Sequence, residues 1–209
     1  MELCCEVLVL GIGNLLWADE GFGIRAVEAL HAEFGFPAAV TLQDGGTLGL
    51  MLYESVATAR RVLVFDAIDF GLAPGTLRVL RDGDVPTWGR TKISPHQTGF
   101  NDVLALAQIN ERAPETIVVI GVQPVELNDF GGSLRAPVRE RLPEAVRLAA
   151  AQLAAWGFPG TPRDRDVPFA ALNADPLMLD EYESGRPSAA EACREGDPRL
   201  LVRLARDDD

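Results

Sequence analysis

The stretch VLVLGIGN at residues 7–14 decides the fold of this chain. Four apolar residues lead directly into Gly11, and a second glycine follows at position 13. An unbroken apolar run ended by glycine is typical of a strand that is buried on both faces of a parallel sheet. Such a strand is normally followed by a helix, and residues 23–34 carry apolar side chains at helical spacings of three and four.

Strand and helix patterns continue to alternate downstream of this first unit. Further strands are expected over residues 39–43, 61–65 and 116–122, with a short edge strand over 76–80. Further helices are expected over residues 48–59, 100–110 and 136–156. This alternation predicts a three-layer α/β/α fold, with a mostly parallel twisted sheet of about five strands.

The character of the chain changes near residue 160. Residues 1–160 carry the strand and helix patterns, whereas residues 161–209 are acidic, contain several prolines and end in three aspartates. Only short apolar pieces occur in this second part. We therefore expect one domain over 1–160 and a weakly ordered C-terminal tail over 161–209.

Composition limits the class of partner. The formal net charge is −12, and Lys92 is the only lysine. An acidic surface without a basic stripe repels phosphate backbones, so we expect no nucleic-acid partner. No apolar stretch approaches 18 residues, so we also expect no insertion into a membrane.

The cysteines and the first residues indicate the compartment. Three cysteines occur, at positions 4, 5 and 193, and this spacing suits neither a disulfide framework nor a zinc motif. The N-terminal residues lack the basic region of a signal peptide. A sparse, odd number of cysteines is typical of a reducing compartment, so we expect a cytoplasmic protein.

Polar side chains that follow the predicted strands are the first candidates for a site, because ligands of open α/β sheets bind at the carboxyl ends of the strands. Glu20, Asp66 and His96 lie in three such places. Two carboxylates and one imidazole could bind a divalent transition metal and leave coordination positions open. Both carboxylates could equally cap or stabilise loops and helix starts.

Two further features of these segments bear on ligand binding. The loop after the first strand has two of the three glycines of a dinucleotide motif, but Leu16 takes the third position and Glu20 would meet phosphate with negative charge. We therefore expect no nucleotide cofactor. His31 lies beside Val27 and Phe34 on its predicted helix, which favours a packed or boundary histidine over a ligand.

At these residues the sequence resembles the hydrogenase maturation proteases, the endopeptidases that finish the large subunit of [NiFe]-hydrogenases. The likeness spans about residues 6–160 and follows the family's order. It is carried by four segments, residues 8–14 with 19–23, residues 44–47, the strand that ends at Asp66, and residues 92–97.

The resemblance implies a specific reaction. Proteases of this family remove a short C-terminal extension from the large-subunit precursor after nickel has entered it. The family's nickel-recognising Glu, Asp and His fall on Glu20, Asp66 and His96, which we take as the catalytic and metal-contacting residues. The nickel belongs to the substrate, and it would dock the scissile bond near an attacking water. It could also polarise the carbonyl group, or an acidic residue alone could drive hydrolysis.

A second set of residues is expected to shape the substrate groove. Gly45 and Gly46 can adopt positive φ and let a peptide approach beside Asp44, although the same residues would form an ordinary tight turn. Gln97 neighbours His96 and could orient substrate or water. Serine-hydrolase and zinc-peptidase signatures are absent from the sequence. A non-catalytic chaperone for the nickel-loaded subunit and a nucleotide-dependent enzyme remain the alternative functions.

Overall fold

A five-stranded sheet organises the part of the chain that the computed structural model describes, which is residues 5–84, 95–164 and 167–186. The strands lie in the order β3-β1-β4-β6-β5, and all neighbours are parallel except the antiparallel pair β5 and β6. Their bounds are β1 Cys5–Ile12, β3 Val40–Gly46, β4 Ala59–Ala67, β5 Leu77–Arg81 and β6 Thr116–Val122. The predicted fold class and the short edge strand are confirmed.

The central strand β1 shows why the sheet forms from these residues. Successive side chains of a strand point to opposite faces, so Val7 and Val9 enter one hydrophobic cluster while Leu8 and Leu10 enter another. All four side chains are buried. The sheet therefore has a core on each face, as the unbroken apolar run at residues 7–10 predicts.

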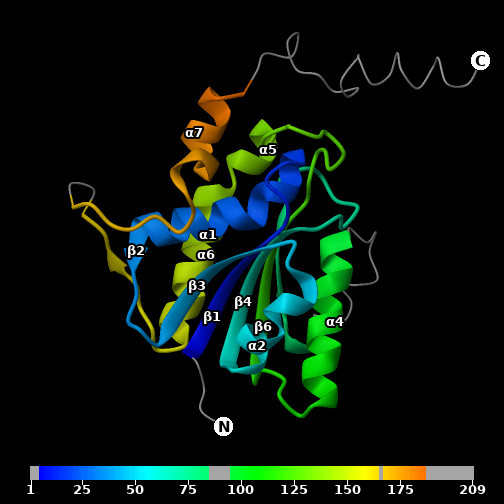
Figure 1. The fold of residues 1–209 in the computed structure, drawn as a ribbon, viewed down its shortest axis with the longest axis vertical. Coiled ribbons are helices and arrows are strands. Elements are labelled where there is room, and N and C mark those ends of the chain that lie inside the picture. The colour runs from blue at the N-terminus through cyan, green and yellow to red at the C-terminus, as the bar shows by residue number, and fades with distance from the viewer. Residues whose placement is uncertain (1–4, 85–94, 165–166, 187–209) are drawn as a thin grey trace, which may run out of the picture. The chain divides into compact units, whose positions relative to one another are not determined.

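Helices cover both faces of the sheet (Figure 1). On one face lie α1 (Phe22–Glu33) and α6 (Leu142–Ala155), and on the other lie α2 (Tyr53–Ala57) and α4 (Pro95–Ile109). Shorter elements of this part of the chain are η1 Ala18–Gly21, β2 Phe34–Gly35, η2 Gly49–Leu52, η3 Asp82–Asp84, α5 Ala136–Arg139 and β7 Thr161–Pro162. Among the described helices, none has both the length and the apolar character needed to cross a membrane.

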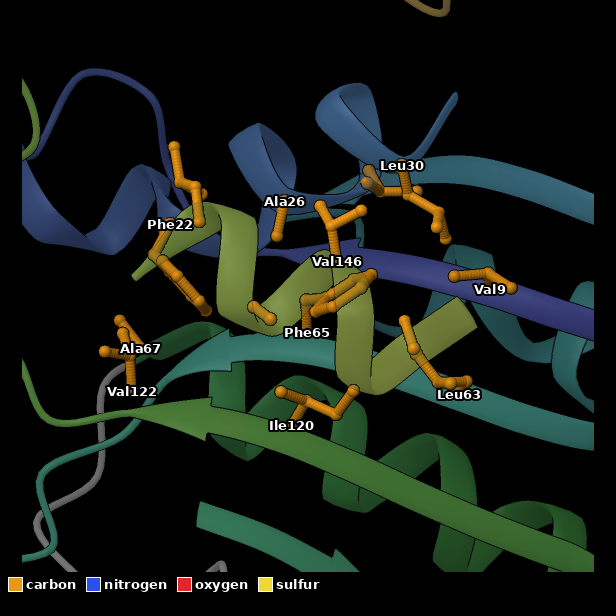
Figure 2. Packing of buried hydrophobic residues seen from close by; sticks show 14 of the residues in the cluster. Val9, Phe22, Ala26, Leu30, Leu63, Phe65, Ala67, Ile120, Val122 and Val146 are labelled. Atoms are coloured by element: carbon orange, nitrogen blue, oxygen red, sulfur yellow. The ribbon is translucent and has the colours of Figure 1, made fainter. Parts of the chain in front are cut away.

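The larger core joins the sheet to α1 and α6. Figure 2 shows Phe65 and Leu63 of β4 with Ala26 of α1 and Val146 of α6 in one packed cluster. The side chain of Phe65 is fully buried. Since replacing a buried phenylalanine by alanine costs about 3–5 kcal/mol, this contact fixes α1 firmly over the end of β4.

The element boundaries differ from the predicted ones at three helices. The helix predicted over 48–59 is divided into η2 and α2, and the one predicted over 136–156 is divided into α5 and α6. Pro143 lies in the first turn of α6, where its missing N–H costs nothing. The helix predicted over 100–110 begins earlier, at Pro95, for which the same preference of proline for a first turn gives the reason.

By their contacts the residues form one unit that ends at Asp175 and a second that begins at Pro176. We call the last described residues of the first unit, 161–164 and 167–175, the strap. Its β7 pairs antiparallel with β2, and Arg163 Nε donates to the carbonyl oxygen of His31 at 2.8 Å. The second unit contains α7 (Leu179–Ser184), and η4 (Asp175–Leu177) lies at the boundary. The predicted domain boundary at residue 160 stays a prediction.

The strap contacts lead to a test of stability. We expect a chain that ends at Gly160 to fold, but to unfold about 5 °C or more below a chain that ends at Asp175, because several hydrogen bonds to α1 are lost. Both chains lack the second unit, so the comparison isolates the strap. Thermal unfolding followed by circular dichroism measures the difference, and equal midpoints would show that the strap adds no stability.

Candidate functional site at the carboxyl edge of the sheet

Strand connections reverse direction between β1 and β4, which are neighbours in the sheet. The chain that leaves β1 moves toward β3 by way of α1 on one face. The chain that leaves β4 moves to the opposite side of the sheet, first to the edge strand β5 and then through α4, on the other face, to β6. Loops that diverge in this way leave a crevice at the carboxyl ends of the strands. Glu20 follows β1 and Asp66 lies near the end of β4, so both flank this point.

Close backbone packing places Glu20. Gly13 has φ of +141°, and a Cβ atom there would lie 1.8 Å from the carbonyl oxygen of Glu20. The same carbonyl oxygen accepts a hydrogen bond from Asn14 N at 3.1 Å. The glycine therefore has a packing role, because it allows η1 to fold back onto the end of β1.

Gly23 brings the same segment against β4. A Cβ atom at this position would lie 2.2 Å from the carbonyl oxygen of Ile12 and 2.3 Å from that of Phe65. The first turn of α1 therefore touches the ends of both strands. Because Asp66 directly follows Phe65, the half-buried Glu20 and the fully buried Asp66 belong to one small region of the edge.

Asp66 lies in the strand itself. It is paired in register with Gly121 of β6. It is separated by an even number of residues from Val62 and Val64, whose side chains belong to the hydrophobic cluster on the face covered by α2 and α4. By strand alternation its side chain is directed to that face. A carboxylate in such low-dielectric surroundings interacts strongly with any nearby charge.

The start of α4 reaches the same edge. A Cβ atom on Gly99, in the N-terminal part of α4, would lie 3.0 Å from the Cα atom of Gly49, the first residue of η2, which follows β3. Because α4 begins at Pro95, His96 and Gln97 lie in the first turn of this helix and not in a loop. Their side chains lie outside the described residues. Among the side chains that are described, no group of three or more His, Cys, Asp or Glu could hold a metal ion.

Asp44 lies near the end of β3, two strands away from Asp66. It is in register with Gly11, as is Phe65 on the opposite side of β1, so Asp44 and Phe65 are separated by roughly 10 Å. Asp44 Oδ1 accepts a hydrogen bond from Gly46 N at 2.8 Å, and Gly46 has φ of +41°. The segment predicted as a turn from Asp44 is thus strand through Gly46, with the turn at its end.

This segment is tied to the Glu20 loop. Gly13 N donates a hydrogen bond to the carbonyl oxygen of Gly46 at 3.1 Å. A Cβ atom on Gly45 would lie 3.3 Å from the carbonyl oxygen of Gly11. The residues that we predict for substrate contact on β3 and after β1 therefore form one connected backbone frame.

A match to a family model covers residues 24–152, more than half of the chain, and the model describes the hydrogenase maturation proteases. The chain belongs to this family. The predicted resemblance is confirmed, and the protein is a hydrolase that acts in hydrogenase maturation.

Curated relatives of this protease extend the match. The hydrogenase expression/formation protein HupM of Azotobacter chroococcum is 51% identical over 205 residues, which cover 98% of this chain and 97% of HupM. The hydrogenase 2 maturation protease of Escherichia coli is 38% identical over 160 residues, which cover 76% of this chain and 97% of that protein. About a quarter of this chain therefore lies outside the second match.

A solved structure shares the fold. The hydrogenase maturating endopeptidase HybD from E. coli superposes with a TM-score of 0.72 at 37% sequence identity. The superposition covers 76% of this chain and 98% of HybD. The three-layer α/β/α fold of this protease is thus shared with a known maturation endopeptidase.

Asp19, which precedes Glu20 in this protease, has a structural role. The residue is fully buried, and its Oδ2 accepts hydrogen bonds from Val125 N at 2.8 Å and Glu126 N at 3.0 Å. Its Oδ1 accepts one from Arg135 N at 2.7 Å. Asp19 thereby fastens the loop after β6 to the loop after β1.

Gln123 is a residue that sequence reasoning missed. It is buried directly after β6, and its Oε1 accepts hydrogen bonds from Phe70 N at 2.7 Å and Leu72 N at 3.1 Å. Its Nε2 donates to Asp69 Oδ1 at 3.1 Å. Gln123 therefore shapes the loop that follows Asp66. The signal that selected Asp66, a polar residue at the end of a buried strand, is equally present here.

Large apolar side chains surround the carboxyl edge of the sheet in the protease. They come from the loops after β1, β3 and β6, and the exposed ones are Leu16, Leu48, Leu50, Met51, Val125 and Phe130. Trp17 packs edge-on against Phe130, with ring centroids 5.3 Å apart. We call these residues the apolar rim. Exposed apolar groups around a polar centre are typical of a surface that binds another chain.

Proposed function

We propose that this protease removes a C-terminal extension from the precursor of a [NiFe]-hydrogenase large subunit, and that it recognises the nickel held by that precursor. The packing of η1 and the first turn of α1 against the ends of β1 and β4, which sets the backbones of Glu20 and Asp66 at one edge of the sheet, supports the proposal. The metal is part of the substrate. The partner is therefore the nickel-loaded precursor.

The three recognising groups are Glu20, Asp66 and His96. Two carboxylates at one edge attract a divalent cation, and imidazole is a favoured ligand of nickel. Glu20 is half-buried, so we assign the first contact with the precursor to it. Because Asp66 is buried in the free protein, its contact with nickel requires the surrounding loops to open when the precursor binds.

Hydrolysis then needs a water molecule at the scissile carbonyl group. One carboxylate accepts the proton of that water as a general base. The nickel either only holds the precursor in place or also polarises the carbonyl oxygen as a Lewis acid. A change in the pH dependence of kcat in Glu20→Gln would assign the base to Glu20.

The remaining parts of the edge suit a peptide. The backbone frame at Asp44, Gly45 and Gly46 offers a place for an extended chain, and Gln97 is proposed to orient substrate or water. The apolar rim supplies contacts for apolar side chains of the extension. The sparse, odd number of cysteines in the sequence is typical of a reducing compartment, and we place the reaction in the cytoplasm.

The central test is processing of a purified precursor, measured by intact mass. We expect the nickel-loaded precursor to lose its C-terminal extension and the nickel-free precursor to stay intact, because the recognising groups need the metal. Cleavage of both forms would show that the protease does not need nickel to recognise the precursor. Binding without any cleavage would contradict the assigned reaction and favour a chaperone for the nickel-loaded subunit.

A further inference from the structure

The strap runs back along α1 toward the site (Figure 1). It starts at the C-terminal end of α1, where Arg163 N donates to the carbonyl oxygen of Glu33 at 2.9 Å. Arg163 Nε donates to the carbonyl oxygens of His31 at 2.8 Å and Phe34 at 3.2 Å. A guanidinium group at this end of a helix satisfies open carbonyls and complements the helix dipole.

The middle of the strap is held by His31. The rings of Phe169 and His31 pack edge-on with their centroids 5.5 Å apart, and Arg163 Cζ lies over the Phe169 ring, 4.7 Å from its centroid. His31 Nε2 lies 2.9 Å from the carbonyl oxygen of Ala170, which it reaches as a donor. These two contacts make His31 an anchor of the strap at the surface of α1.

The strap reaches the site through Asn173. Its Nδ2 donates one hydrogen bond to Glu28 Oε1 at 2.8 Å and another to Asp44 Oδ2 at 2.9 Å. Both partners are carboxylate oxygens, so only the amide nitrogen can make these bonds, and its two protons are used once each. Glu28 is buried and ion-paired with Arg25 at 2.8 Å.

We propose that Asn173 is a positioning residue, which fixes the carboxylate of Asp44 for contact with the substrate backbone. The inference rests on the proposed function, in which Asp44 lines the substrate groove. Gly46 N holds one oxygen of Asp44 and Asn173 holds the other. With both oxygens fixed, the carboxylate keeps one orientation and still has lone pairs for a peptide N–H.

Charge explains why an amide stands between the two acids. Glu28 and Asp44 both accept from the same NH₂ group, and without it two like charges would face each other in a half-buried place. Asp44 would then turn away from Glu28, and the loop at Gly46 would lose its anchor. Asn173, near the end of the strap, thus determines the orientation of Asp44 at the sheet edge, which is 129 residues away in sequence.

The first experiment compares Asn173→Ala with His31→Ala in the full-length protease on the nickel-loaded precursor. We expect Asn173→Ala to raise KM about tenfold with little change in kcat, because hydrogen bonds to a charged group of the groove are lost. His31→Ala loosens the strap at Ala170 without touching Asp44, so its KM should equal that of the wild type. An unchanged KM in Asn173→Ala would overturn the proposal.

A double-mutant cycle tests whether Asn173 acts through Asp44. In an Asp44→Ala background, Asn173→Ala should add no further rise in KM, since the group that it positions is gone. Independent, multiplying effects of the two substitutions would contradict the proposal. Equal rises in KM for Asn173→Ala and His31→Ala would also contradict the proposal, because they would show that the strap only stabilises the fold and does not position Asp44.

Amide hydrogen exchange separates this inference from the proposed function. We expect Asn173→Ala to speed exchange at Gly46 N, which Asp44 holds, and His31→Ala to leave it unchanged. This measurement needs no substrate. A wild-type protein that fails to cleave the precursor would refute the proposed function, whereas unchanged exchange at Gly46 in Asn173→Ala would refute the positioning role alone.

Discussion

Glu20→Gln is expected to lower processing of the nickel-loaded precursor by at least about a hundredfold, while the unfolding temperature stays near that of the wild type. Glutamine keeps the size of the side chain but removes the negative charge that we assign to nickel contact. The backbone of Glu20, which packs against Gly13, is unaffected by the substitution. Single-turnover kinetics with intact-mass detection measure the loss.

A matched control lies on the same segment of the fold. Glu33 is an exposed acid at the end of α1, so Glu33→Gln makes the same change of charge away from the edge and should process normally. His96→Ala should behave like Glu20→Gln, and His31→Ala should keep activity. Equal losses in the two histidine variants at unchanged stability would show that the wrong histidine was chosen.

Asp19→Ala is expected to destabilise the protein by about 3 kcal/mol or more. The substitution leaves three partly buried backbone N–H groups, of Val125, Glu126 and Arg135, without their shared acceptor. The loops after β1 and β6 would then separate, and processing should fall with them. Urea-induced unfolding at neutral pH measures the free energy of unfolding.

Asp19→Asn refines this result. Asparagine keeps the shape but has only one acceptor oxygen, so its NH₂ group must face at least one backbone N–H, and we expect an intermediate loss. The exposed Asp102 on α4 supplies the control, and Asp102→Ala should change stability by less than about 0.5 kcal/mol. A stable Asp19→Ala variant with normal loops would mean that these hydrogen bonds contribute little.

Much of the sheet and half of the candidate site could be predicted from local pattern. The apolar run at residues 7–10 indicates a strand buried on both faces of the sheet, because in such a strand no side chain faces solvent and all positions are apolar. Glu20 and Asp66 could be found because the carboxyl ends of parallel strands meet at one edge. Their closeness depends on Gly13 and Gly23, whose backbone contacts appear only in the folded chain.

The remaining features depend on tertiary contacts that no local pattern encodes. Asn173 lies in a segment with little periodicity, and its partners Glu28 and Asp44 are 145 and 129 residues away. Asp19 gives the same sequence signal as a helix cap, although its acceptors serve a distant loop. The early start of α4 was missed because the apolar periodicity begins only at Phe100.

The antiparallel strand β5 also affects how the protein behaves in solution. It is five residues long, and it carries exposed arginines at positions 78 and 81. A short, positively charged edge discourages the addition of a foreign strand, which is a common route to aggregation. An extended polypeptide released near the protein is therefore disfavoured from joining the sheet at β5.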